Sequence, residues 1–298
     1  MVKEDKKTIV AAVDTTDVSQ AMFKEALVLA SSLRARVVMV SVTPEYEGNM
    51  NRFFIKDAEQ QLKEPFQLIL EKAGDYASSL GLEMKTVRRH GKPSDEIIDV
   101  ALQEKADLII LGSSKRMQLE RMMLGRTIAE IIHDGPCDVL LIPANSEIRF
   151  NKVLVEINDF PSRPEAGLRA FDVAKSYSSE IHAMYVVDIA PDRSLRSGVL
   201  RDAEKKGSAV LKEYAAQGES QGLRVYTEIG RNMPEKCLVE YAQKQNIHLI
   251  VIGSNEDAGM FEMLWGSAVE RVASKSVCPI LVAKKRKEEE KSFLSYAI

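Results

Sequence analysis

The chain contains the same segment twice. The run DLIILGS at Asp107–Ser113 returns as HLIVIGS at His248–Ser254. Three pairs of landmarks keep one spacing of 141 residues: Gly112 with Gly253, Gly125 with Gly266, and Cys137 with Cys278. A constant offset through separate landmarks indicates a duplication, and this period is far longer than the roughly 20–50 residues of solenoid repeats. Each copy is therefore a domain, and the protein holds two versions of one site.

Length and charge narrow the class of protein. At ~150 residues per domain, a chain of 298 residues agrees with two domains. The net charge of −3 gives no reason to expect nucleic acid as the main partner. No apolar run approaches the ~18 residues of a membrane span. The charged start, MVKEDKK, is not typical of a signal peptide. We therefore expect a cytoplasmic protein.

The residues that hold metals or form disulfides are scattered. Three cysteines at wide spacing predict neither a disulfide framework nor a zinc ligand set. The four histidines also lack metal-ligand spacing. Cys137 and Cys278 each precede an apolar run, which favours a role as small buried residues. We expect no metal site.

Short apolar runs alternate with helical patterns along each half. In the first half we expect strands at Thr8–Val13, Arg36–Val42, Glu83–Arg89, Leu108–Leu111 and Val139–Ile142. In the second half we expect strands at Val153–Ile157, Ile181–Val187, Arg224–Glu228, Leu249–Ile252 and Ile280–Val282. Near-continuous apolar strands between helices predict parallel sheets covered on both faces. The fold class is therefore α/β, with two repeated, doubly wound, Rossmann-like domains of five strands each.

The domain boundaries follow from the repeat. We expect domain 1 at residues 1–147, domain 2 at residues 148–284 and a charged C-terminal tail at residues 285–298. The linker, Ala144–Glu147, is only a few residues long. We also expect the last strands of the two domains to run antiparallel, because an uncovered edge strand is a liability. This pairing would make the chain an internal pseudo-dimer, and a further homodimer stays open.

Three local signals concern the helices of the first half. Ser19 and Ser94 each stand where an N-cap residue belongs, before helical patterns that end at Leu33 and Gln103. Pro65 lies inside the helical pattern of residues 57–80, where it should kink or interrupt the helix.

Three elements point to one place in the first domain. Asp14 ends the first strand, a loop begins at Gly112 after the fourth strand, and Gly125 precedes a short helix. Ligands of doubly wound sheets sit beyond the carboxyl ends of the strands. Glycines let backbone N–H groups approach an anion, and a helix start offers unpaired donors. Together these features can hold the phosphates of a nucleotide.

The chain resembles the universal stress protein family, over nearly its whole length. Nucleotide-binding members carry Gly, two residues, Gly, nine residues, Gly, then Ser or Thr. The first half keeps this spacing from Gly112 to Gly125-Arg126-Thr127, and the second from Gly253 to Gly266-Ser267. The middle glycine is replaced by Lys115 and by Glu256. Further marks of the family are Val13-Asp14, Gly91-Lys-Pro93 and the run Cys278–Val282.

The resemblance implies a set of ligand contacts. The aspartate after the first strand contacts the adenine or ribose side, and backbone near the end of the second strand joins it. Residues after the last glycine contact phosphates. The implied nucleotide-binding residues of domain 1 are Val13, Asp14, Val42, Gly112, Ser113, Lys115, Gly125, Arg126 and Thr127. A weaker second site would comprise Asn158, Val186, Gly253, Gly266 and Ser267.

Each of these residues also has a structural interpretation. Asp14 can cap a turn before the first helix. Thr127 with Glu130, and Ser267 with Glu270, have the spacing of a capping box. The glycines can serve as tight strand exits. The basic residues Lys115, Arg116, Arg121 and Arg126 can form a solvated face.

The two sites differ in charge. The phosphate loop of domain 1 is basic, whereas the matching stretch of domain 2 carries Glu256, Asp257 and Glu262. Like charges ~4 Å apart cost about 1 kcal/mol in water and more at a shielded site. Asn158 also replaces the aspartate found at Asp14. We therefore expect at most one high-affinity nucleotide per chain, held in domain 1.

The function that the resemblance implies is regulatory. We expect a stress-response protein that binds adenine nucleotide, ATP or AMP with or without Mg²⁺, and that signals to an unidentified protein partner. A nucleotide-free interaction adaptor is the alternative. An adenine-nucleotide α-hydrolase is disfavoured, because Asp14–Ser19 lacks the Ser-Gly-Gly-x-Asp-Ser loop of that group. No catalytic set can be assembled from the motifs, so we expect at most slow ATP hydrolysis and not a true enzyme.

Overall fold

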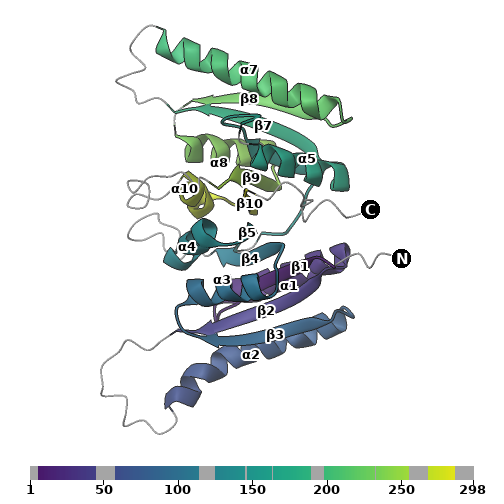
Figure 1. Cartoon of the computed structure of the whole chain (residues 1–298), viewed down its shortest axis with the longest axis vertical. Helices are drawn as coiled ribbons and strands as arrows, with labels where there is room; N and C mark the ends of the chain where they lie inside the picture. The colour runs from purple at the N-terminus through teal and green to yellow at the C-terminus, as the bar shows by residue number, and fades with distance from the viewer. Residues whose placement is uncertain are drawn as a thin grey trace. The chain divides into compact units, whose positions relative to one another are not determined.

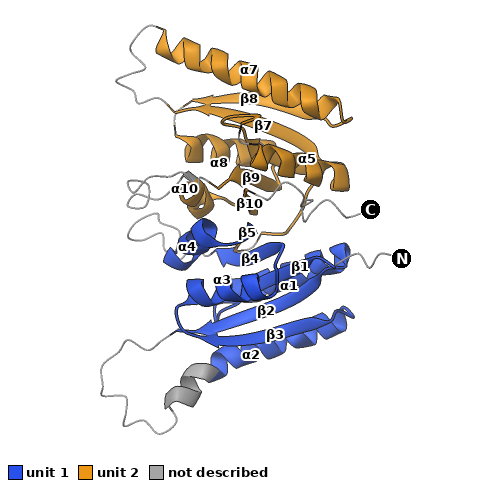
Figure 2. Cartoon of the chain, in the orientation of Figure 1, with its two compact units in different colours: residues 1–114, 125–140 blue, residues 115–124, 141–298 orange. Residues whose placement is uncertain are grey.

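The computed structural model describes residues 6–44, 58–113, 125–144, 146–162, 164–188, 198–231, 233–254 and 268–285, with the side chains of residues 58–63 and 268 left out (Figure 1). Within these ranges helices alternate with strands along the chain. The chain divides into two compact units (Figure 2). Unit 1 comprises residues 1–114 and 125–140, and unit 2 comprises residues 115–124 and 141–298, so the division falls within the strand of residues 138–143, which is described with unit 1 below.

Unit 1 is built on five strands in the order β3-β2-β1-β4-β5. The strands are β1 (Thr8–Ala12), β2 (Arg36–Thr43), β3 (Met84–His90), β4 (Leu108–Ser113) and β5 (Asp138–Pro143). The helices are α1 (Asp17–Leu33), α2 (Ala58–Ser79), α3 (Pro93–Gln103) and α4 (Arg126–Asp134). The pairs β1–β2, β2–β3 and β1–β4 are parallel. The strand order reverses at β1, as expected for a doubly wound sheet.

Unit 2 repeats the plan in the order β10-β9-β6-β7-β8. Its strands are β6 (Lys152–Glu156), β7 (Glu180–Val187), β8 (Val225–Arg231), β9 (Leu249–Gly253) and β10 (Ile280–Ala283). Its helices are α5 (Glu165–Tyr177), α7 (Val199–Glu219), α8 (Pro234–Gln245) and α10 (Ala268–Lys275). The pairs β6–β7, β6–β9, β7–β8 and β9–β10 are parallel. The predicted fold class and all ten predicted strands are confirmed.

Helices cover both faces of each sheet. On β3, Arg88 bonds to Gln67 of α2 and the next residue, Arg89, bonds to Gln103 of α3. Successive strand residues point to opposite faces, so α2 and α3 lie on opposite sides of the sheet. Helix α1 contacts α2, and α4 contacts α3. Covered on both faces, β1 and β4 are almost wholly apolar and buried, as predicted.

Unit 2 has the same layers. His182 of β7 forms a hydrogen bond with Tyr241 of α8, whereas the opposite face of β7 packs against α7. Helix α10 contacts α8, and Tyr214 of α7 stacks on Phe171 of α5 with ring centroids 4.5 Å apart. The fold is therefore a three-layer arrangement in each unit.

Helix α1 begins earlier than predicted. Its N-cap is Thr16, not Ser19, because Thr16 has extended backbone and its side chain accepts a hydrogen bond from the Ser19 backbone N–H. Ser19 is buried in the first turn, and its hydroxyl donates to Asp14. The prediction failed because Thr16 and Ser19 are both good capping residues, and only the path of the chain selects one.

Two other helix predictions can be compared with the structure. Helix α2 continues through Pro65, so the expected interruption is wrong, while a kink at Pro65 stays a prediction. A proline removes one backbone bond, and the burial of Ile69, Leu70 and Ala73 farther along the helix offsets that loss. Ser94 is not the cap of α3, because the helix begins at Pro93 after Lys92 and has no side-chain cap.

Some expectations stay predictions. The pairing of the last strands and the exact domain boundaries are not tested, and residues 286–298 of the tail lie outside the described residues. Among the residues that the structure describes, no helix has both the length and the hydropathy needed to cross a membrane.

Candidate functional site

The carboxyl ends of β1 and β4 lie side by side in unit 1. The register pairs Ala12 with Leu111. The residues that follow each strand, Val13-Asp14 and Gly112-Ser113, are therefore neighbours at the point where the strand order reverses. This is the place where doubly wound sheets bind their ligands. Four of the predicted site residues are brought together here.

Asp14 is exposed and uses one carboxylate oxygen to hold the start of α1. Its Oδ1 accepts hydrogen bonds from the Thr16 backbone N–H at 2.9 Å, the Thr16 hydroxyl at 2.6 Å and the Ser19 hydroxyl at 2.6 Å. Within the described part of the chain, Oδ2 has no partner. Asp14 thus has the structural role that the sequence left open, and one carboxylate oxygen remains available to a ligand.

Val13 and Val42 are held by the sheet. The Val13 N–H donates to the Val40 carbonyl at 2.8 Å, and the buried Ser41 hydroxyl donates to the Val13 carbonyl at 2.9 Å. Val42 is buried at the end of β2. These bonds fix the backbone on both sides of Asp14.

Gly112 lies against the first turns of α1. A Cβ atom built on Gly112 would stand 3.2 Å from Val18 Cγ1 and 3.5 Å from Met22 Cβ. A side chain here would push α1 away from β4, so the position favours glycine for packing alone. Ser113 is buried beside it.

The N-terminus of α4 has backbone donors that the helix itself does not use. Gly125 is the N-cap, and its carbonyl accepts from the N–H groups of Ile128 and Ala129. The N–H groups of Arg126 and Thr127 precede these and have no partner within the helix. A Cβ built on Gly125 meets no atom of the described residues within 4 Å. Among the described residues, nothing therefore fills the space beside the helix start.

The capping box predicted for Thr127 and Glu130 is wrong. The cap is Gly125 and makes no side-chain capping bond. Glu130 instead accepts hydrogen bonds from Ser94 at 2.5 Å and from Arg126 at 2.9 Å, and pairs with Lys92 at 3.1 Å. Those hydrogen bonds, that of Ser94 first, lower the pKa of Glu130 to about 2. Arg126, predicted to bind phosphate, is thus already paired with a carboxylate.

Comparison with known proteins identifies the family. The sequence profile of the universal stress protein family matches residues 6–143 and again residues 149–284. The chain belongs to the universal stress protein family. The two matches confirm the tandem arrangement that the repeat predicts.

Individual relatives agree with this assignment. A universal stress protein of Methanocaldococcus jannaschii is 31% identical over 150 residues, which make up 49% of this chain and 88% of that protein. One from Mycobacterium tuberculosis H37Rv is 27% identical over 193 residues, or 62% of this chain and 64% of that protein. The crystal structure of a universal stress protein from Archaeoglobus fulgidus has a TM-score of 0.73 at 20% identity, covering 95% of this chain and 97% of that one. The last comparison shows that the fold is shared.

The second universal stress protein unit differs from the first at its switch point, the place where the strand order reverses. Asn158 stands in the place of Asp14, and its side chain is hydrogen-bonded to Glu156, the last residue of β6. Glu156 is buried and replaces the small Ala12 of β1. Burial raises the pKa of Glu156 to about 7, against the opposing effect of the Asn158 hydrogen bond. The amide predicted to face a ligand is therefore engaged by the protein.

The remaining predicted residues divide into two groups. Val186 is buried at the end of β7, and a Cβ on Gly253 would meet no atom of the described residues within 4 Å. Lys115, Gly266 and Ser267 lie outside the described residues, as do Arg116, Arg121, Glu256, Asp257 and Glu262. Their roles stay predictions.

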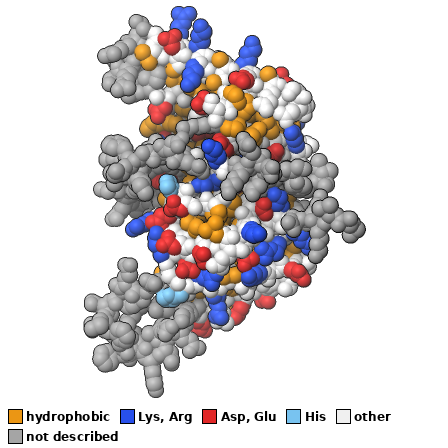
Figure 3. All heavy atoms as spheres, in the orientation of Figure 1, with side chains coloured by type: hydrophobic (Ala, Val, Ile, Leu, Met, Phe, Trp, Pro, Cys, Tyr) orange, Lys and Arg blue, Asp and Glu red, His pale blue; other side chains and the backbone are white. Residues whose placement is uncertain are grey.

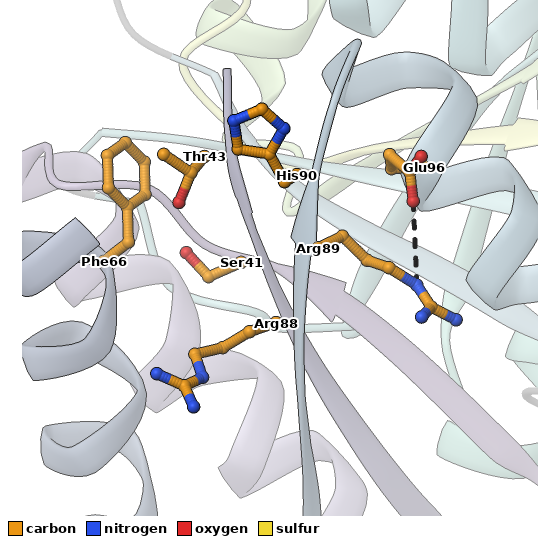
Figure 4. A pocket seen from close by; sticks show the side chains of 7 residues that line it. All are labelled: Ser41, Thr43, Phe66, Arg88, Arg89, His90 and Glu96. Atoms are coloured by element: carbon orange, nitrogen blue, oxygen red, sulfur yellow. Dashed lines mark ion pairs between the residues drawn. The ribbon is translucent and has the colours of Figure 1, made fainter. Parts of the chain in front are cut away.

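Sequence reasoning missed a pocket beside the predicted site. A cavity of about 560 Å³ opens at the ends of β2 and β3 in unit 1 (Figure 4). Its lining comprises Ser41, Thr43, Phe66, Arg88, Arg89, His90 and Glu96. Ser41 and Thr43 flank Val42 in the chain, so the cavity adjoins the predicted nucleotide site. The run Arg88-Arg89-His90 at the end of a strand was the available signal.

Gly91 shapes one side of this pocket. Its φ of +145° is a conformation that other residues rarely adopt. A Cβ at Gly91 would stand 3.1 Å from Glu96 Oε1. The glycine of the family's Gly-x-Pro mark therefore lets the Glu96 carboxylate approach the backbone, where Glu96 pairs with Arg89 at 3.6 Å.

The surface charge is mixed. Figure 3 shows basic and acidic side chains interspersed over the visible described surface, in accord with a net charge of −3. Among the described residues, no group of three or more His, Cys, Asp and Glu side chains could hold a metal ion.

Proposed function

We propose that this universal stress protein is a regulatory protein that binds adenine nucleotide, ATP or AMP, in unit 1. The observation that carries the proposal is the Oδ2 atom of Asp14, which has no partner among the described residues and lies at the carboxyl end of β1, next to Gly112 of β4. Such an oxygen can accept hydrogen bonds from an adenine amine or a ribose hydroxyl. The backbone N–H groups of Arg126 and Thr127 at the start of α4 would face the phosphates.

Regulation would follow from the way that Asp14 is built into the fold. Its other oxygen, Oδ1, holds Thr16 and Ser19 at the start of α1. A ligand on Oδ2 therefore contacts the residue that fixes the α1 N-terminus. A nucleotide that binds one arrangement of this region better than another shifts its population, and with it the affinity for a protein partner.

Unit 2 would bind nucleotide weakly or not at all. Asn158 is held by Glu156, and a carboxyl buried at that switch point opposes a polyanion whenever it is ionised. The same observation supports the second candidate function, in which unit 2 serves as a structural or partner-binding module. If both units had this role, the protein would be a nucleotide-free adaptor.

The first experiment is to denature the protein, purified without added nucleotide, and analyse the released small molecules. Adenine nucleotide in the supernatant supports the proposal. Titration calorimetry of the full chain with ATP and AMP should then give a dissociation constant in the micromolar range, about −8 kcal/mol, with one site per chain. Two equivalent sites, or no heat at millimolar nucleotide, would contradict the proposal.

The matched variants are Asp14→Asn and Asn158→Asp. Asparagine at position 14 keeps one oxygen for Thr16 and Ser19 but replaces the free oxygen with an N–H₂ donor. We expect at least a tenfold loss of affinity with little change in thermal stability. Asn158→Asp places a second carboxyl beside Glu156 and should leave nucleotide affinity unchanged, because the ligand is bound in unit 1.

A further inference from the structure

Four polar side chains of the pocket share one face of the sheet. The parallel register pairs Ser41 of β2 with Arg88 of β3, and Thr43 with His90. Side chains two apart on a strand point to the same face, and paired residues on neighbouring strands do likewise. Arg88 bonds to Gln67 of α2, so this is the face that α2 covers. Two hydroxyls, a guanidinium and an imidazole therefore form one patch.

Phe66 of α2 lies over this patch. Figure 4 shows Phe66, Thr43, Ser41 and Arg88 on one side of β3, with Arg89 and Glu96 on the other. The cavity thus has an aromatic wall, a polar floor and a cationic side chain. It combines an apolar surface with a few polar groups, as small-molecule sites do.

The two arginines differ in charge compensation. Arg89 pairs with Glu96 at 3.6 Å. Arg88 donates only to the neutral amide oxygen of Gln67, at 3.0 Å, within the part of the chain that the structure describes. Arg88 is therefore the cation of the pocket that still lacks an anionic partner there.

Unit 2 fills the equivalent space with its own side chain. Tyr185 is the sixth residue of β7, as Ser41 is of β2, and Gly207 is the ninth residue of α7, as Phe66 is of α2. The ring of Tyr185 packs against Gly207, where a Cβ would stand only 2.5 Å from Tyr185 Cδ1. In unit 1 the small residue is on the strand and the aromatic residue is on the helix, whereas in unit 2 the aromatic residue is on the strand and glycine is on the helix.

The charges also differ between the units. Ile229, the fifth residue of β8, stands in the place of Arg88, and Arg231 stands in the place of His90. Arg231 is already bonded to Glu204 of α7 at 2.6 Å. Within the described residues, the cation without a carboxylate partner and the open space are therefore features of unit 1, and the shared fold does not require them.

We propose that this pocket binds a small organic oxyanion, with its carboxylate or phosphate on Arg88 and a flat apolar body against Phe66. A guanidinium binds either group through paired N–H donors, and the Thr43 hydroxyl adds a further donor or acceptor. The site is separate from the one proposed for nucleotide. It adjoins that site because the Ser41 hydroxyl donates to the Val13 carbonyl.

The test is a titration of the full-length protein with phenyl phosphate and with phenylacetate, followed by calorimetry and ligand-observed NMR. The two probes distinguish phosphate from carboxylate as the preferred anion. Neutral benzyl alcohol serves as the control for the apolar body alone. We expect saturable binding of at least one anionic probe and none of the alcohol over the same range. Equal binding of the alcohol, or no binding of either anion at millimolar concentration, would overturn the proposal.

Variants locate the site. Arg88→Gln should weaken the anionic probe roughly ten- to a hundredfold, the loss of one charge-assisted contact, while Arg88→Lys should retain part of the affinity. Arg224→Gln is the matched control, an exposed arginine of unit 2 that pairs with Glu180. The double variant Ser41→Tyr with Phe66→Gly copies the packing of unit 2 and should abolish binding. An unchanged affinity in Arg88→Gln would refute the assignment even if the double variant does not fold.

Nucleotide binding is measured on the same variants. Arg88→Gln should leave ATP and AMP affinity unchanged if the two sites are separate. Displacement of the phenyl probe by either nucleotide, together with loss of nucleotide binding in Arg88→Gln, would show a single nucleotide site here and overturn the proposal of a second ligand.

Discussion

Ser94 on α3 donates a hydrogen bond to the Glu130 carboxylate on α4, and this contact joins the two helices on one face of unit 1. Unit 2 joins α8 to α10 at the same place with the chemistry reversed. Glu235 follows Pro234 as Ser94 follows Pro93, and it pairs with Arg271 at 3.3 Å. The carboxylate lies on α4 in unit 1 and on α8 in unit 2, so the two units join the equivalent helices through different residues.

The link in unit 1 should weaken in acid. The pKa of Glu130 lies at about 2 in the folded protein, below its ordinary value of 4.5. A lowered carboxyl pKa gives stability that is complete above 4.5 and is lost as the pH falls towards 2. Urea midpoints at pH 7, 4 and 3 should therefore fall more steeply for the native protein than for Glu130→Gln. Parallel curves would show that Glu130 contributes nothing to the acid transition.

The link in unit 2 should depend on both partners. Glu235 is 3% exposed, and Arg271 and Lys275 are its cationic neighbours. Arg271→Ala leaves a buried carboxylate with only Lys275, and we expect a loss of about 1–3 kcal/mol in the free energy of unfolding. Arg271→Glu should cost more, and adding Glu235→Ser should recover part of the loss by copying unit 1. If the double variant were less stable than Arg271→Glu, the proposed equivalence would fail.

Glu156 should make the protein less stable as the pH rises. Its carboxyl ionises near 4.5 when unfolded and near 7 when folded. Between these values the folded state keeps a proton that the unfolded state has lost, so stability falls by up to about 3 kcal/mol and stays low above pH 7. Burial lowers the pKa of His182 and of His248 in the folded protein. Their titrations therefore raise the stability as the pH rises, which opposes the effect of Glu156.

Glu156→Gln isolates this effect, because native protein and variant share the histidines. The difference in stability between the two should grow from pH 5 to pH 8 in favour of the variant. A constant difference over that range would mean that Glu156 is not buried as an acid in solution.

Tyr214 should contribute to stability through one hydroxyl. It is fully buried, donates to the Gly167 carbonyl at 3.0 Å and stacks on Phe171. Tyr214→Phe keeps the ring but leaves that carbonyl without a donor, at an expected cost of about 1–2 kcal/mol by chemical denaturation. Tyr226→Phe, at a half-exposed ring of the same unit, is the control and should change stability by less than about 0.5 kcal/mol.

Local patterns were enough to predict the fold. Strands such as Leu108–Ser113 and Leu249–Gly253 are nearly all apolar because helices cover both faces of the sheet, and that burial is visible in the sequence. The repeat predicted two units because landmarks such as Gly112 and Gly253 keep one offset. The position of Asp14 at the switch point could also be predicted, because strand order and strand ends follow from the alternation of helices and strands.

Side-chain partners were beyond those patterns. Thr16 and Ser19 have equal capping chemistry, but the path of the chain makes Thr16 the N-cap. Glu130 has the spacing of a capping box, but its carboxylate accepts a hydrogen bond from Ser94 on another helix. The bond between Asn158 and Glu156 likewise cannot be predicted from the sequence, because it depends on the path of the chain after β6.

The sequence by itself determined the two α/β units and the ends of their strands, where doubly wound sheets bind ligands, because burial periodicity and strand order are local and additive. Only the tertiary structure decided which polar groups meet. The pocket of Ser41, Phe66 and Arg88 joins residues from two strands and a helix, and Tyr185 fills the same space in unit 2. Whether such a space is open depends on the volumes of side chains far apart in the chain, which packing settles jointly.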